Sequence, residues 1–145
     1  MERANAFALL VNGADDAAVR KALASLPAND LAAAYEGWRA ETLPLSEAPD
    51  HVVDSIIEHD IGGFMALAMS THTAEARREW CDQALVEMAN IPVSLVVDAI
   101  AAARIKVSFA NRFIPFIHEF VEARMDALRS EGVRLERLMR IAHGG

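Results

Sequence analysis

The sequence predicts a compact all-α protein, and three features of its composition and spacing favour helices over strands. Alanine, the strongest helix former, is spread along the whole chain, whereas Tyr and Thr are few. No segment alternates apolar and polar residues at a period of two, as a half-buried strand would. Several segments instead place apolar residues three and four positions apart, which is the period of a helix with one buried face. We expect one domain over residues 1–145, with six to seven helices and a long amphipathic C-terminal helix.

Three helices are expected ahead of a linker at residues 42–48. They cover about residues 3–11, about residues 15–26, and a stretch from Asn29 or Asp30 to the segment Thr42-Leu43-Pro44. The third carries an apolar stripe formed by Leu31, Ala34, Tyr35 and Trp38.

The middle of the chain is expected to form three more helical stretches. Pro49 is well placed as the first residue of a helix that Gly62-Gly63 ends or kinks. Its buried face is formed by Val52, Val53, Ile56, Ile57 and Ile61. A cap in the Ser70 to Thr73 cluster opens a helix over about residues 73–89, and Pro92 opens another that reaches about Arg104.

The last helix follows a short connection at residues 106–112. Pro115 opens it, and an apolar residue then recurs every seven positions at Val121, Leu128, Leu135 and Ala142. A single helix of roughly 28 residues, about 42 Å long, fits this pattern. Gly132 is its expected weak point, because glycine disfavours a helix interior.

Composition limits the functions that this chain can have. A length of 145 residues with 53% apolar residues suffices for one well-packed domain. The net charge of -7 disfavours a purely electrostatic nucleic-acid binder, so direct binding of nucleic acid is expected to be weak. One cysteine, Cys81, cannot form an internal disulfide, and no targeting or membrane-spanning segment is recognisable. A cytoplasmic protein is therefore expected.

Motifs that would carry catalysis or bind a cofactor are not recognisable in the sequence. His51 and His59 lie eight positions apart, which is too far to chelate one ion without a third element. Cys81 follows Trp80 on an apolar helix face, where a core role is expected. Neither a phosphate-binding glycine loop nor a dinucleotide fingerprint occurs. We expect no enzymatic activity, no catalytic residue, no metal and no cofactor.

Charge is unevenly distributed along the chain. Residues 1–97 hold 6 basic and 15 acidic residues, whereas residues 98–145 hold 8 basic and 6 acidic ones. Arg104, Lys106 and Arg112 cluster around the connection before the last helix, where they could meet an acidic partner or a phosphate backbone. Three aromatic residues are interleaved with them, and these either close the core or offer a stacking surface: Phe109, Phe113 and Phe116.

The order of motifs in residues 84–140 is also informative. An apolar helix opened by Ile91-Pro92 leads to a connection with Phe109, and Phe113-Ile114-Pro115 and Glu119-Phe120 then open a long Arg-rich helix. A proline-opened helix, an F-x-P turn and an E-[FIL] helix in this order resemble small phage- and prophage-encoded replication proteins of the helicase loader or helicase inhibitor type. The resemblance covers about the last two-fifths of the chain.

This resemblance implies a non-enzymatic phage or mobile-element protein that binds the host's hexameric replicative helicase, either to load or to inhibit it. In such proteins the C-terminal part is often the mobile, helicase-contacting segment, which here corresponds to about residues 130–143. An amphipathic helix laid into a groove would be the binding mode. The expected partner-binding residues are Arg134, Leu135, Arg137, Leu138, Met139 and Arg140.

Two alternatives remain open at this point. A phage-encoded anti-defence inhibitor would have the same size and acidity, and the acidic N-terminal two-thirds could then mimic nucleic acid. A homodimeric helical regulator or structural protein could use the long C-terminal helix, with its seven-residue repeat, as the seam between two copies.

Overall fold

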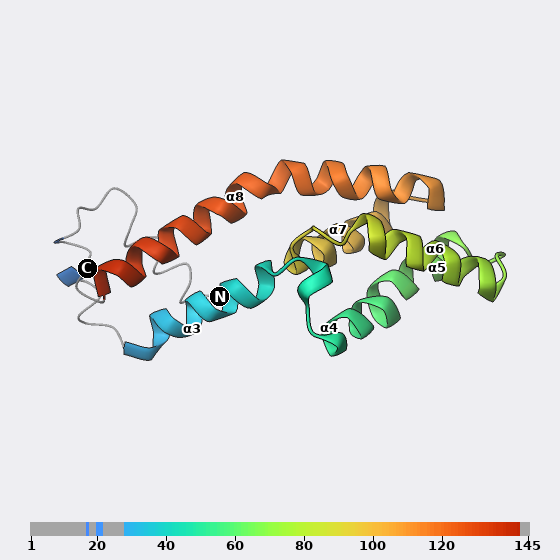
Figure 1. Cartoon of the computed structure of the whole chain (residues 1–145). Helices are drawn as coiled ribbons and strands as arrows, with labels where there is room; N and C mark the ends of the chain where they lie inside the picture. The colour runs from blue at the N-terminus through green and yellow to red at the C-terminus, as the bar shows by residue number, and fades with distance from the viewer. Residues whose placement is uncertain (1–16, 18–19, 22–27, 143–145) are drawn as a thin grey trace. The chain divides into compact units, whose positions relative to one another are not determined.

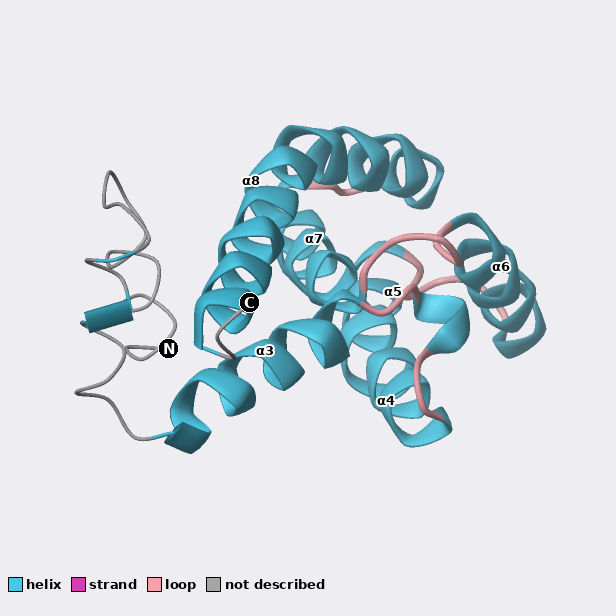
Figure 2. Cartoon of the chain, turned by 60° about the vertical axis from the view of Figure 1, so that its left-hand side comes forward, coloured by secondary structure: helices cyan, strands magenta, loops and turns pink. Residues whose placement is uncertain are grey.

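The computed structural model describes residues 17, 20, 21 and 28–142, and Figure 2 shows helices and loops there but no strand. The elements are α3 (Ala28–Thr42), the 3-10 helix η1 (Leu45–Glu47), α4 (Asp50–Ser55), the π-helix η2 (Ile56–Ile61), α5 (Gly62–Ala68), α6 (Ala74–Glu87), α7 (Val93–Lys106), the 3-10 helix η3 (Ala110–Arg112) and α8 (Phe113–Ala142). The all-α prediction is confirmed. The described part of the chain holds five α-helices plus the long C-terminal one, rather than the six to seven expected. That expectation included residues 3–11 and 15–26, which lie largely outside the described residues.

The chain divides into two compact units. The terminal unit comprises Met1–Ala40 and Met125–Gly145, and the central unit comprises Glu41–Arg124. The described part of the terminal unit contains most of α3 and the C-terminal half of α8, whereas α4 to α7 belong to the central unit (Figure 1). Compact units of this kind can belong to one domain, so the single-domain expectation stays a prediction.

In the terminal unit, α3 packs against the C-terminal half of α8. Its buried cluster consists of Leu31, Leu135, Leu138 and Ile141, and Ala34, Tyr35, Trp38 and Met139 pack against it in partly buried positions. The rings of Tyr35 and Trp38 stack with their centroids 6.2 Å apart. The apolar stripe predicted for the third helix is thus the face that α3 buries.

Helix α8 runs through Gly132 without a break, although this residue is the expected weak point. Gly132 is buried, and a Cβ atom added there would come within 3.0 Å of the Trp38 ring. The missing side chain therefore lets the indole of α3 approach the backbone of α8 closely. A packing requirement explains this glycine better than flexibility does.

The core of the central unit is formed mainly by α7 and the helices around it. Ala99 and Ala103 are fully buried one turn apart on α7, and such small side chains let neighbouring helices approach closely. The largest fully buried side chains of this unit are Phe64, Phe113, Ile61, Met88, Ile100, Ile117 and Val96. Helix α6 begins as predicted, because the Thr73 hydroxyl accepts a hydrogen bond of 3.0 Å from the backbone N–H of Ala76.

The predicted linker at residues 42–48 is held in place by the backbone. Pro44 and Pro92 form an isolated antiparallel bridge. The Leu45 N–H donates to the Ile91 carbonyl at 2.9 Å, and the Val93 N–H donates to the Leu43 carbonyl at 2.9 Å. Pro92 and Pro49 each cap the helix that follows, so the predicted helix starts are correct to within one residue.

Gly62-Gly63 neither ends nor sharply divides the buried helix of the central unit. The chain passes from α4 through a π-helical turn at Ile56–Ile61 into α5, which begins at Gly62. The Gly62 N–H donates to the Ile57 carbonyl, a bond that spans five residues. The wider turn lets Ile56 and Ile61 both reach the core although they lie five positions apart.

Candidate functional site

The connection between α7 and α8 places cationic and aromatic side chains around one hollow of the central unit. Helix α7 ends because Val107 takes an extended conformation, with φ -114° and ψ 122°. Phe109 is also extended, and the short helix η3 then turns the chain into α8 at Phe113. Helix α8 therefore begins two residues before Pro115, which lies in its first turn, where the missing N–H of proline costs no hydrogen bond.

The three phenylalanines of this connection have different environments. Phe113 is fully buried, and its ring centroid lies 4.5 Å from that of Phe64 and 5.0 Å from that of Trp80. Phe116 is half-buried on the next turn of α8. Phe109 remains 69% exposed although it is a large apolar side chain. Phe113 therefore belongs to the core, and Phe109 belongs to the surface.

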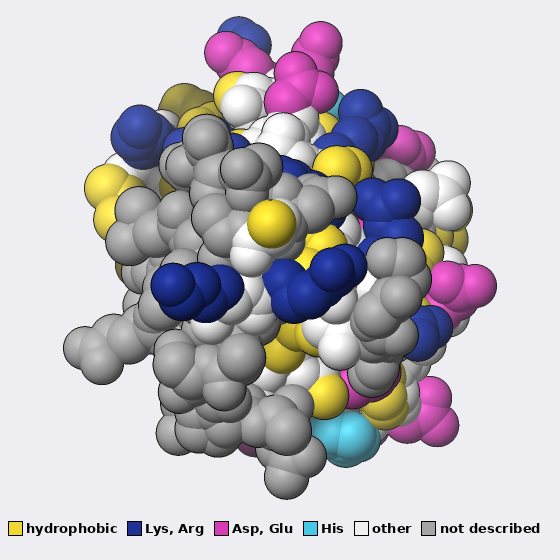
Figure 3. Space-filling model, turned by 90° about the vertical axis from the view of Figure 1, so that its left-hand side faces the viewer, with side chains coloured by type: hydrophobic (Ala, Val, Ile, Leu, Met, Phe, Trp, Pro, Cys, Tyr) yellow, Lys and Arg dark blue, Asp and Glu magenta, His cyan; other side chains and the backbone are white. Residues whose placement is uncertain are grey.

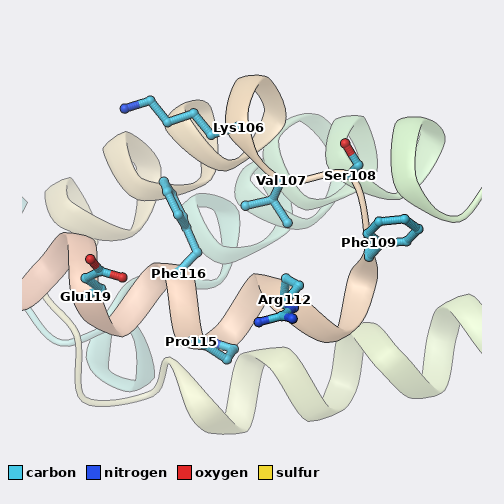
Figure 4. Close-up of a pocket in the computed structure, with 8 residues that line it drawn as sticks. All are labelled: Lys106, Val107, Ser108, Phe109, Arg112, Pro115, Phe116 and Glu119. Atoms are coloured by element: carbon cyan, nitrogen blue, oxygen red, sulfur yellow. The ribbon is translucent and has the colours of Figure 1, made fainter.

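A shallow hollow of about 400 Å³ lies at this connection. Figure 4 shows Phe116 pointing from the start of α8 toward the end of α7 that carries Lys106, while Phe109 lies at the opposite side of the group. The lining residues are Lys106, Val107, Ser108, Phe109, Arg112, Pro115, Phe116 and Glu119. We call this the cationic hollow, because Lys106 and Arg112 outnumber its single carboxylate.

Phe109 also borders a second hollow, of about 660 Å³, on the side of α5 and α6. Its lining residues are Ala68, Met69, His72, Ala76, Glu79, Trp80, Gln83, Phe109, Ala110 and Asn111. We call this the apolar hollow, since most of the surface that it offers belongs to carbon and sulfur atoms. Its Trp80 is held by ring contacts to Phe64 at 5.5 Å and to Phe113, so one side of the hollow is fixed by the core.

The sequence around Phe109 contrasts in charge with the rest of the chain. No Asp or Glu occurs between Asp98 and Glu119, whereas Arg104, Lys106 and Arg112 lie within that stretch. All three cations are exposed. In a chain of net charge -7, this connection is therefore a local site of attraction for anionic groups.

Of the three cations predicted at this connection, the structure brings only two to the cationic hollow. Lys106 and Arg112 line it. Arg104 instead lies over α5, because a Cβ atom added to Gly63 would meet the Arg104 guanidinium carbon at 2.7 Å. The glycine at position 63 thus leaves room for Arg104 to rest on the helix backbone.

The residues predicted as partner-binding on the C-terminal helix divide between core and surface. Leu135 is 3% exposed and Leu138 fully buried in the cluster with Leu31, so α3 covers both side chains. Met139 packs partly buried against the same cluster. Arg134 and Arg137 are half-buried, and Arg140 is exposed. The leucines therefore cannot act as surface anchors while α3 and α8 are paired, and their role toward a partner stays a prediction.

Cations remain accessible around this pair of helices. Figure 3 shows one face of the molecule, on which Lys and Arg side chains lie beside hydrophobic ones. A hollow of about 440 Å³ on α8 is lined by Asp126, Arg129, Ser130, Val133 and Arg134. Arg129 and Asp126 form an exposed ion pair of 3.8 Å, which contributes little to stability.

The remaining candidate groups are Cys81 and the side chains of the described residues that could ligate a metal. Cys81 is buried, and its burial, together with the neighbouring charge of Asp82, raises the pKa of the thiol above its ordinary value. Within residues 17, 20, 21 and 28–142, no three His, Cys, Asp or Glu side chains gather to hold a metal ion. Likewise, no helix in the described part of the chain is long and apolar enough to cross a membrane.

Sequence reasoning left the exposure of Phe109 open and missed that of Ile105. Ile105 is 85% exposed at the end of α7, and Phe109 follows four residues later. The available signal was the run without acidic residues, which marks a surface that differs from the rest of the chain.

Comparison of the chain with family models, with curated proteins and with solved structures found no match.

Proposed function

We propose that this chain is a non-enzymatic adaptor that binds the hexameric replicative helicase of a host cell, either to load it or to inhibit it. The support is the order of motifs from Ile91-Pro92 to Glu119-Phe120, which resembles phage replication proteins of the loader or inhibitor type. In the structure these motifs form α7, the connection and the start of α8. The proposed contact is this connection rather than the C-terminal leucines, which α3 covers.

One observation carries the proposal, namely the exposure of Phe109 between two hollows on the same surface. An exposed phenylalanine beside a preformed hollow is a common anchor in protein interfaces, because it offers a large apolar area at little entropic cost. Lys106 and Arg112 line the same hollow as Phe109, and such charges steer a partner and fix its orientation.

The experiment is a measurement of the affinity of the purified helicase hexamer for the immobilised full chain. We expect Phe109→Ala to weaken binding by about tenfold or more, which corresponds to ~1.4 kcal/mol. Val86→Ala is the matched control, because Val86 is 70% exposed on α6 of the same unit but lines neither hollow. Far-UV circular dichroism checks that both variants keep their helices.

Two results would contradict the proposal. No binding of the wild-type chain to the helicase would remove it altogether. Equal losses in the two variants would show that the connection is not the contact. A chain that instead sediments as a dimer would favour the homodimeric alternative, and binding to a basic host enzyme would favour the anti-defence one.

A further inference from the structure

From the charges and the two hollows around Phe109, we infer the chemistry of the segment that binds there: an acidic, amphipathic peptide segment of a protein partner. Its carboxylates face Lys106 and Arg112 in the cationic hollow, and its apolar side chains pack on Phe109 and in the apolar hollow. This inference rests on the proposed function, since it requires that the connection binds a protein.

The charge of the surface is the first argument for an acidic occupant. Lys106 and Arg112 line one hollow, and no acidic residue lies between Asp98 and Glu119 in the sequence. Both cations are exposed. They can therefore adjust to a carboxylate without leaving a buried charge unpaired.

The second argument is the apolar surface that Phe109 shares with its neighbours. Phe109 borders both hollows, so a segment crossing it touches the cations on one side and Met69 and Trp80 on the other. Trp80 is held in place by Phe64 and Phe113, which makes this wall preformed rather than one that must be ordered on binding. A peptide segment with apolar and acidic side chains at helical spacing matches a surface that offers cations on one side and an apolar wall on the other.

A nucleic-acid strand fits the same surface less well. Its phosphates repeat along the whole strand, yet Glu119 lines the cationic hollow and Glu79 lines the apolar one. A peptide can place a carboxylate at Lys106 and a neutral side chain at Glu79, whereas a phosphate backbone cannot vary its charge in this way.

The test compares charge reversals at the cationic hollow with a reversal elsewhere on the same unit. We expect Lys106→Glu and Arg112→Glu each to weaken helicase binding by about tenfold or more. Lys106→Arg should keep it. Arg78→Glu is the control, because Arg78 is exposed on α6 and lines neither hollow. Raising the salt concentration should weaken the wild type more than the two reversed variants.

A second arm uses defined probes and does not depend on the helicase. A labelled peptide of Leu and Glu at helical spacing should bind the wild-type chain, and Lys106→Glu should abolish this binding. The same peptide with Lys in place of Glu, and a labelled oligothymidylate, should not bind. Fluorescence anisotropy measures all three.

The outcomes separate the two claims. Helicase binding that survives both reversals overturns the acidic-segment inference and leaves the proposed function standing. A helicase that fails to bind the wild type overturns the proposed function, and the peptide arm then decides the inference alone. Oligothymidylate binding that is lost in Lys106→Glu, with no binding of the acidic peptide, assigns the hollow to nucleic acid and overturns the inference.

Discussion

Two glycines of the terminal unit, Gly37 and Gly132, lie in helices but differ in their surroundings. Nothing lies within 4 Å of a Cβ atom added at Gly37, whereas one added at Gly132 would collide with the Trp38 ring. Each glycine costs its helix roughly 0.5–1 kcal/mol relative to alanine. Only Gly132 gains a close ring contact in return, so the same substitution should have opposite effects at the two positions.

We predict that Gly37→Ala stabilises the chain by roughly 0.5–1 kcal/mol, because it removes the cost of a helical glycine without a clash. Gly132→Ala should instead destabilise it by about 1–3 kcal/mol, because the methyl group displaces Trp38. Urea unfolding followed by tryptophan fluorescence measures both. If the two variants shift the midpoint in the same direction, the packing role of Gly132 is refuted.

The same residues show where sequence reasoning reaches its limit. The stripe of Leu31, Ala34, Tyr35 and Trp38 could be predicted because a helical period is a local property. The role of Gly132 could not, because it depends on a ring more than ninety positions earlier in the chain. Glycine alone does not tell whether a helix breaks, bends or admits a neighbour.

Among the elements, α8 offers the clearest contrast between an interior and a surface side chain. Leu138 is fully buried in the cluster with Leu31, whereas Val133 is 64% exposed. The apolar residues that suggested partner anchors on this helix are those that hold α3. An amphipathic stripe is the same in sequence whether its partner is an internal helix or another protein.

We expect Leu138→Ala to cost about 2–5 kcal/mol of unfolding free energy, because it leaves a cavity between α3 and α8. Val133→Ala should change stability by less than about 0.5 kcal/mol, since its side chain is largely solvated. Chemical denaturation of both variants checks this. Equal stability of Leu138→Ala and the wild type would show that the pairing of the two helices contributes little.

Some elements of the central unit could be predicted from the sequence, and one could not. The cap at Thr73 and the starts at Pro49 and Pro92 follow from local chemistry and were predicted to within one residue. The π-helical turn at Ile56–Ile61 was not, because residues Ile56 and Ile57 also fit an ordinary helix. Only the buried position of Ile61, five residues after Ile56, distinguishes the two.

The candidate site was predictable only in part, for a physical reason. The cations Lys106 and Arg112 were expected beside the connection, because charge is visible in a sequence. The exposure of Phe109 and the burial of Phe113 could not be predicted, because an apolar side chain next to a turn packs inward or outward according to tertiary contacts. The ring contacts of Phe113 with Phe64 and Trp80 decide this.

At the scale of the whole molecule, charge is unequally distributed, and the connection between α7 and α8 lies in the less acidic part of the chain. Residues 1–97 carry a net charge of -9 and residues 98–145 one of +2, so the last third of the chain is the part that repels anionic groups least. The apolar surface of Phe109 lies within that part. The charge contrast and the exposed ring together support the proposal that this connection binds another protein.

Site-specific crosslinking to the helicase tests this claim most directly. A photoreactive benzoylphenylalanine in place of Phe109 should crosslink to the helicase hexamer. The same group in place of Val86 should not, since Val86 is equally exposed but lines neither hollow. Benzoylphenylalanine in place of Arg140, which is exposed on α8, tests the C-terminal contact that the resemblance implies. Crosslinks from position 109 alone are the predicted result. Crosslinks from position 140 with none from position 109 would contradict the account.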